Sequence, residues 1–182
     1  MSAKRENIAV LIDGHALSIV SQGLGLKPDF RKLRTSFSSM GRLRLIKYYN
    51  VVVEADGLEN SIVKVLDWLE YNGYRVFRKM LRPFENDPGN RRIKGSTTAE
   101  ISVDLVLQAP SVDQIFLFGN SVDYVYAVTE AQRLGVSVTL VSTLKADGCR
   151  PSVELRRAVD DFIEIDDFRL EMGSSATHMA AE

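Results

Sequence analysis

The chain has 182 residues, of which 45% are hydrophobic and 26% are charged, and its formal net charge is −1. This length suits one domain with a substantial core, and the composition is that of a soluble globular protein. The near-neutral charge excludes a polycation, so any binding of nucleic acid has to come from a local basic patch. The single Cys149 excludes an internal disulfide.

Strand-like and helix-like segments alternate from the N-terminus onward. Residues 7–12 form a continuous apolar run, which predicts a buried strand. We expect a glycine-rich connection over residues 21–26, followed by a helix that starts at residues 27–29 and ends near Gly41. Residues 42–53 are rich in β-branched and aromatic side chains and predict a second strand.

The alternation continues through the middle of the chain. Residues 58–71 place apolar side chains at helical spacing, and Gly73 provides a C-terminal stop. Residues 74–80 predict a strand, and a loop with two prolines and two glycines follows it. Residues 98–108 predict a helix that Thr97 or Thr98 can cap.

Strands and helices also alternate in the last third of the chain. Strands are predicted at residues 113–118 and 136–142, with a helix over residues 123–134 between them. A further helix is expected at residues 151–159, and residues 162–165 can add a short edge strand. This order predicts an α/β fold, a three-layer α/β/α sandwich with a mostly parallel central sheet.

One domain accounts for the whole pattern. We assign residues 1–172 to it and expect the small, polar segment of residues 173–182 to be disordered. No apolar run approaches the roughly 20 residues that a membrane-spanning helix needs, and no signal peptide is visible. We therefore expect a cytoplasmic protein that does not bind membranes.

Acidic residues lie where such a sheet would gather them. Asp13 ends the first apolar run, Asp123 follows the strand at residues 113–118, and Glu100 and Asp104 share one helical face. Ligands of open α/β sheets bind at the carboxyl ends of the strands. Carboxylates brought together repel one another, and a divalent cation with oxygen ligands offsets that charge. The pattern predicts a Mg²⁺ or Mn²⁺ site formed by Asp13, Glu100, Asp104 and Asp123.

Each acid also has a simpler explanation. An aspartate at a strand end, such as Asp13, is more often a turn or N-cap residue than a ligand. Glu100 suits the first turn of a helix, and Asp123 can cap the helix that follows it. Asp104 is harder to explain in this way, because it interrupts an apolar stretch. Their joint placement at one predicted edge favours the functional interpretation.

A basic segment precedes the acidic helix. Residues 75–94 contain seven basic and two acidic residues, a local charge of +5. Such a patch can hold a nucleic-acid backbone beside the acids, although a solvated strand edge and loop would carry the same charges. Residues 160–171 contain six acidic residues and one basic residue, and this charge split can favour a homo-oligomer. The residues expected to bind the backbone are Arg82, Arg91, Arg92 and Lys94.

Several segments, in order, resemble the NYN domains, a PIN-like family that includes LabA-type bacterial proteins. The resemblance spans residues 7–165 and rests on IAVLIDG, IKYYN, the Lys94-Gly95 turn before the acidic helix, and FLFGNSVDY. It implies a PIN-like fold and a metal-dependent ribonuclease. Mg²⁺ or Mn²⁺ would offset the charge that builds up during hydrolysis of the phosphodiester. The residues that it implies to be catalytic are Asp13, Glu100, Asp104, Asn120 and Asp123.

The chain departs from the family pattern at two of these positions. Asn120 stands where the family has the first acid of a Ser-Gly-Asp motif, and a one-residue insertion then aligns Asp123 with the second acid. Glu100 stands where the family has an aspartate, so the charge is kept on a longer side chain. These departures leave an alternative open, a regulatory RNA-binding module with a degenerate acidic site. A third alternative is a small-molecule or protein-interaction domain on a generic α/β scaffold.

Overall fold

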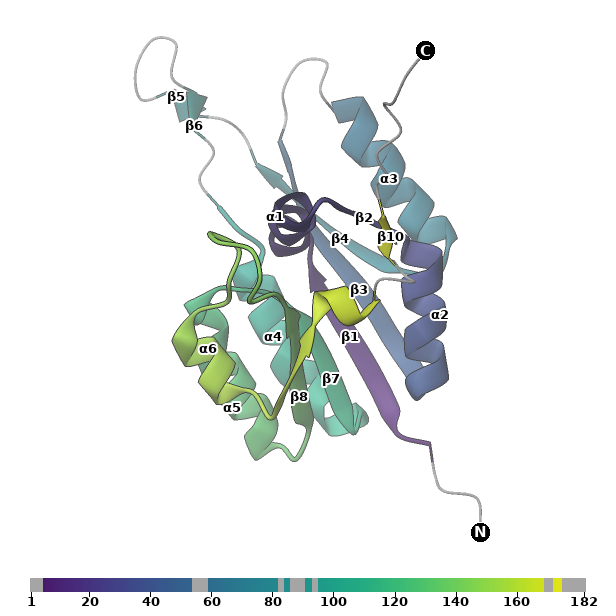
Figure 1. The fold of residues 1–182 in the computed structure, drawn as a ribbon, viewed down its shortest axis with the longest axis vertical. Coiled ribbons are helices and arrows are strands. Elements are labelled where there is room, and N and C mark those ends of the chain that lie inside the picture. The colour runs from purple at the N-terminus through teal and green to yellow at the C-terminus, as the bar shows by residue number, and fades with distance from the viewer. Residues whose placement is uncertain are drawn as a thin grey trace.

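A computed structural model describes residues 5–53, 59–81, 84–85, 91–92, 95–168 and 172–174. Its main feature is a six-stranded sheet in the order β4-β3-β1-β7-β8-β9, in which every neighbouring pair is parallel (Figure 1). The strands are β1 (Asn7–Asp13), β3 (Arg42–Val53), β4 (Arg75–Leu81), β7 (Gln114–Phe118), β8 (Ser137–Ser142) and β9 (Asp161–Glu164). The predicted parallel sheet is confirmed.

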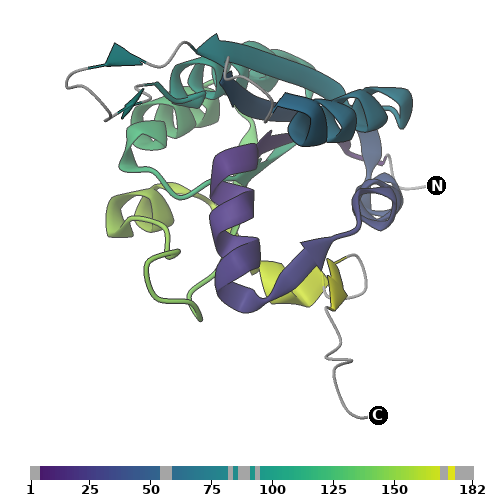
Figure 2. The same cartoon turned by 90° about the horizontal axis from the view of Figure 1, so that it is seen from above.

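Helices cover both faces of this sheet (Figure 2). One face carries α1 (Gly14–Leu24), α2 (Phe30–Met40) and α3 (Glu59–Tyr71), which pack into one hydrophobic cluster. The other carries α4 (Thr98–Gln108), α5 (Val125–Arg133) and α6 (Val153–Ala158), which pack into a second. The predicted three-layer α/β/α sandwich is therefore confirmed.

The central strand β1 contributes to both clusters. Ile8, Val10 and Ile12 face the α1–α3 side, while Ala9 and Leu11 face the α4–α6 side, and none is more than 1% exposed. A parallel strand buried on both faces needs apolar residues at every position rather than at alternate ones. This explains the continuous apolar run in the sequence and fixes Asp13 at the carboxyl edge of the sheet.

Helix α1 differs from the expectation for its segment. The predicted glycine-rich connection at residues 21–26 is wrong for its first four residues, which complete α1. Gly25 ends the helix with φ 63, a left-handed conformation that favours glycine. Gly23 lies inside the helix, where a β-carbon would come within 2.7 Å of the sulfur of Cys149. Close packing, rather than a turn, explains Gly23.

The segment after α1 also differs from the prediction. Residues 26–28 form a short strand, β2 (Leu26–Pro28), and Asp29 is the N-cap of α2, so the predicted helix start at residues 27–29 is too early. Strand β2 pairs antiparallel with β10 (Met172–Ser174). Residues 173 and 174, expected in a disordered tail, belong to β10, and residues 175–182 lie outside the described part.

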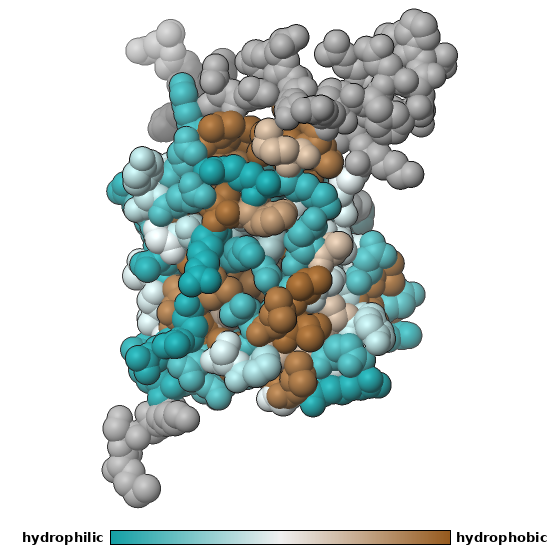
Figure 3. Space-filling view, turned by 180° about the vertical axis from the view of Figure 1, so that it is seen from behind, coloured by the Kyte–Doolittle hydropathy of each residue, from teal (hydrophilic) through white to brown (hydrophobic). Residues whose placement is uncertain are grey.

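The remaining elements are short. Three 3-10 turns, η1 (Ala109–Ser111), η2 (Val122–Tyr124) and η3 (Ile165–Phe168), join longer elements, and β5 (Phe84–Glu85) pairs with β6 (Arg91–Arg92). On the face seen from behind, hydrophobic residues gather among hydrophilic ones (Figure 3). Among the described helices, none combines the length and apolar character required to cross a lipid bilayer.

Candidate functional site

Asp13 is buried at the carboxyl end of β1, with 8% of its surface exposed. Its Oδ1 atom accepts hydrogen bonds from the backbone N–H groups of His15, at 3.0 Å, and Ala16, at 3.2 Å. These are the bonds of an N-cap, so Asp13 starts α1. The prediction that Asp13 is an N-cap residue is therefore confirmed.

The second carboxylate oxygen of Asp13 points toward the α4 side of the sheet. It accepts a hydrogen bond of 2.7 Å from the hydroxyl of Tyr124, a fully buried residue. Tyr124 also forms a side-chain hydrogen bond with Thr98, the first residue of α4. Burial, and then the charge of Asp13, raise the pKa of the Tyr124 phenol far above its usual range, so the phenol stays a donor. Tyr124 thus joins Asp13 to the start of the acidic helix.

Asp104 lies over the strand β3. Its Oδ2 atom accepts hydrogen bonds from the ammonium of Lys47 and from the hydroxyl of Tyr49, both at 2.5 Å. Lys47 and Tyr49 are two residues apart on β3, so their side chains lie on the same face of the sheet. Tyr49 pairs in register with Asp13. Burial, and then the bond to Asp104, raise the pKa of Tyr49 well above its usual value. Asp104 is held by one cation and one neutral donor.

Glu100 is held in a similar way by the neighbouring strand β4. Its Oε1 atom lies 2.7 Å from the ammonium of Lys79, which also donates to the carbonyl of Ser96 at 2.8 Å. Burial acts to raise the pKa of Glu100, but the hydrogen bond from Lys79, a hydrogen bond from its own backbone N–H and the charge of Lys79 together hold this pKa below its usual value. The Oε2 atom is buried without a hydrogen-bond partner among the described residues.

The two residues after β7 make local contacts. The carbonyl of Asn120 accepts a hydrogen bond of 3.0 Å from the N–H of Ser152. Asp123 is exposed, and its Oδ2 atom accepts a hydrogen bond of 3.0 Å from the hydroxyl of Ser121. The backbone N–H of Asp123 donates a hydrogen bond to the same hydroxyl, so Ser121 is the N-cap of η2. The structure therefore links Asp13 with α4, whereas Asp123 lies inside η2 and is hydrogen-bonded to the Ser121 cap.

The sequence that builds this site also matches a known protein family. The profile of the NYN domain family matches residues 7–166. The chain belongs to the NYN domain family. This NYN chain is 27% identical over 176 residues to the "Low amplitude and bright protein LabA" of Synechococcus elongatus, a match that covers 93% of this chain and 89% of LabA. The resemblance recognised in the sequence is confirmed.

A solved structure shares the fold of this chain. A protein of unknown function from Vibrio parahaemolyticus superimposes with a TM-score of 0.69, at 20% sequence identity. The match covers 92% of this chain and 97% of the other. At this identity the likeness concerns the fold alone.

The acids of this NYN chain have suitable chemistry for a metal but an unsuitable arrangement. Carboxylate oxygens are good ligands for Mg²⁺ and Mn²⁺, and the unpartnered Oε2 of Glu100 has a free lone pair. Within the described ranges, however, no three histidine, cysteine or acidic residues are grouped so as to hold an ion. The ammonium groups of Lys47 and Lys79 already offset Asp104 and Glu100. In this arrangement the residues do not fit a divalent metal.

The basic segment is only partly described. The side chains of the four residues expected to bind RNA, namely Arg82, Arg91, Arg92 and Lys94, lie outside the described part. On β4, Arg78 pairs with Asp67 at 2.8 Å and with Glu70 at 2.9 Å, and Lys79 pairs with Glu100. Two of the seven cations counted in the sequence are therefore engaged within the protein.

Sequence reasoning did not place four residues beside the acids, although it counted Lys79 in the basic segment. They are Lys47, Tyr49, Lys79 and Tyr124. A signal for Lys47 was present, because a lysine inside the strand Arg42–Val53 is unusual unless a partner offsets its charge. No signal in the sequence pairs it with Asp104, since that contact depends on the register between α4 and the sheet.

Proposed function

We propose that this protein is a regulatory RNA-binding protein built on the NYN nuclease fold, with an acidic site of weakened hydrolytic activity. The observation that carries the proposal is the pairing of both helix acids with lysines, Asp104 with Lys47 and Glu100 with Lys79. Hydrolysis of a phosphodiester requires positive charge that is not already neutralised, to offset the charge that builds up on the phosphate. Ammonium groups fixed on carboxylates cannot supply it.

The same pairs favour binding of RNA. Four bare carboxylates at one edge would repel a phosphate backbone, whereas an acid paired with a lysine at 2.5–2.7 Å has little net charge. Asn120 acts in the same direction, because it stands without charge where the family carries an acid. The membership of the NYN family makes RNA the polymer that we expect at this edge.

A metal-dependent ribonuclease is the second candidate. It is favoured by the buried Oε2 atom of Glu100, whose lack of a partner in the described residues costs stability unless a ligand completes it. This function requires Lys79 to leave Glu100. Binding of Mg²⁺ or Mn²⁺ would then have to outweigh the loss of the ion pair.

Two assays separate these candidates. Fluorescence anisotropy with a labelled single-stranded RNA measures binding, and gel electrophoresis of the same RNA with Mn²⁺ measures cleavage. The proposal predicts binding with little or no cleavage. Asp13→Asn is the control, because asparagine still caps α1 and the variant should fold. If the acids do not hold a catalytic metal, this substitution should leave any residual cleavage unchanged. Multiple-turnover cleavage that is lost in Asp13→Asn would contradict the proposal and establish the ribonuclease.

A further inference from the structure

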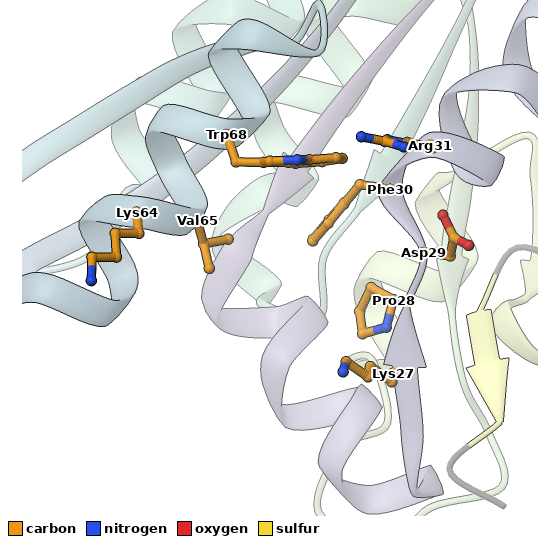
Figure 4. Close-up of a pocket in the computed structure, with 8 residues that line it drawn as sticks. All are labelled: Lys27, Pro28, Asp29, Phe30, Arg31, Lys64, Val65 and Trp68. Carbon is orange, nitrogen blue, oxygen red and sulfur yellow. The ribbon is translucent and has the colours of Figure 1, made fainter.

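A groove lies between α3 and the segment that joins β2 to α2, on the face of the sheet opposite the acidic helix. Its volume is about 610 Å³, and residues 27–31 and three residues of α3 line it (Figure 4). Trp68 and Phe30 are half-buried, so both aromatic rings present part of their surface to this space. Figure 4 shows Phe30, Pro28 and Val65 around the space beside the Trp68 ring.

Three cations surround this apolar lining. Lys27, Arg31 and Lys64 are exposed, and none has an ion pair with a described acid. The guanidinium of Arg31 lies over the indole ring of Trp68, 5.3 Å from its centroid. The one acid of the groove, Asp29, already caps α2 and lies 3.8 Å from Lys32. The rim therefore carries positive charge that is available to an anion.

A second hollow continues the groove toward the carboxyl edge of the sheet. It has a volume of about 260 Å³ and shares Lys27, Pro28 and Phe30 with the first. Tyr48 lines it, and burial, followed by the charge of Asp13, raises the pKa of Tyr48 to about 12.

The wall of this hollow also contains an unsatisfied polar group. Ser21 is only 5% exposed, and its hydroxyl has no hydrogen-bond partner among the described residues. A buried hydroxyl of this kind is normally completed by a ligand or a water molecule. The hollow thus offers a polar group next to an apolar and cationic groove.

We propose that the groove and the hollow bind single-stranded RNA, which deepens the proposed function and rests on it. A base stacks against Trp68 and Phe30, as bases do on aromatic side chains of single-strand binding proteins. The flanking phosphates pair with Lys27, Arg31 and Lys64. The adjoining hollow receives the next nucleotide, with the hydroxyl of Ser21 as a polar partner. A duplex does not fit, because its bases are already stacked on one another.

The chain contains a single tryptophan, so its fluorescence reports on this groove directly. Titration of the full-length protein with a 12-nucleotide single-stranded RNA should quench the fluorescence of Trp68, and a duplex of the same length should not. Anisotropy of the labelled RNA measures total binding in the same samples. Adenosine monophosphate is the third probe, which distinguishes a polymer site from a site for a free nucleotide.

Substitutions in the rim test the assignment of the phosphates. Lys27→Ala and Lys64→Ala alter exposed side chains, and each should reduce affinity severalfold and lower the salt dependence by about one counterion. Arg157→Ala removes an exposed cation on α6, on the opposite face, and should leave both quantities unchanged. Trp68→Leu should weaken binding about fivefold or more in the anisotropy assay. A cooperative thermal unfolding transition of Trp68→Leu would show that this variant folds.

Each outcome decides a different claim. Binding of RNA without quenching of Trp68 would overturn the groove and leave the proposed function standing. Quenching by adenosine monophosphate but not by the oligonucleotide would overturn RNA as the occupant. Absence of any RNA binding would overturn the proposed function together with this inference. Quenching by the single strand, with weaker binding in the rim variants only, is the result that the structure predicts.

Discussion

The ammonium of Lys47 lies 2.5 Å from the carboxylate of Asp104, although the two residues are 57 positions apart in the chain. The contact joins β3 to α4 across the buried side of the sheet, with side chains that are 22% and 17% exposed. Lys79 and Glu100 repeat the contact from the neighbouring strand. These two pairs give the acidic helix its electrostatic partners without a bound ion.

The first prediction concerns the stability of the Lys47–Asp104 pair. Asp104→Asn should lower the free energy of unfolding by about 2 kcal/mol, because it leaves Lys47 largely buried without an opposite charge. Urea denaturation measures the change. In a double-mutant cycle with Lys47→Met, the two substitutions should be non-additive by about 1 kcal/mol or more. Additive effects would show that the pair does not contribute.

The link between Asp13 and Tyr124 gives a second prediction. Tyr124→Phe removes one hydrogen bond to a buried carboxylate and keeps the ring, so it should cost about 1.5 kcal/mol of unfolding free energy. Tyr126→Phe is the matched control, since Tyr126 is 75% exposed and should tolerate the change. Equal stability of Tyr124→Phe and the unsubstituted protein would contradict the described contact.

The third prediction follows from the pKa of Glu100. Because Lys79 holds this pKa below its usual value, the ionised carboxylate stabilises the folded state above the unfolded-state pKa of about 4.3. That contribution should disappear as the pH falls through the lower pKa of the folded state. The stability difference between the unsubstituted protein and Glu100→Gln should therefore be largest above about pH 5 and shrink toward pH 3.

Thermal unfolding from pH 3 to pH 7 measures this difference. Glu154→Gln, at an exposed position in the first turn of α6, controls for the general effect of removing one acid. A difference between the unsubstituted protein and Glu100→Gln that is constant with pH, or that grows toward acid, would show that Lys79 does not act on Glu100 as described.

A fourth prediction tests the packing of α1. Gly23→Ala places a β-carbon 2.7 Å from the sulfur of Cys149, so the helix or the loop that carries Cys149 has to shift. The substitution should lower the free energy of unfolding by about 1–3 kcal/mol, despite the higher helix propensity of alanine. Cys149→Ala in the same background should recover part of the loss, because it removes the obstructing atom. No effect of either substitution would contradict the close approach.

The sequence predicted the order of strands and main helices because β1 and β7 each contain a continuous apolar run and α3 has apolar residues at helical spacing. It failed at α1, where Gly23 was read as a breaker although it serves close packing. It also failed at β2, whose partner β10 lies more than 140 residues away in the chain. Local patterns carry no information on such distant pairing.

The candidate site was predicted only in part for the same reason. Asp13, Glu100 and Asp104 were recognisable as acids near one edge, and Asp13 and α4 are in fact joined through Tyr124. Their partners Lys47 and Lys79 belong to strands whose registers against α4 cannot be read from the sequence. The predicted capping role of Asp123 is wrong, because Ser121 is the N-cap of η2 and Tyr124 is the N-cap of α5.

Calorimetric titration with Mn²⁺ tests most directly whether lysines, rather than a metal, offset the acidic helix. The unsubstituted protein should show no saturable binding tighter than about 1 mM, the weak end of the range for carboxylate sites. The double variant Lys47→Met/Lys79→Met should gain affinity, since its carboxylates lose their ammonium partners. Stoichiometric micromolar binding by the unsubstituted protein, abolished in Asp104→Asn, would contradict the account.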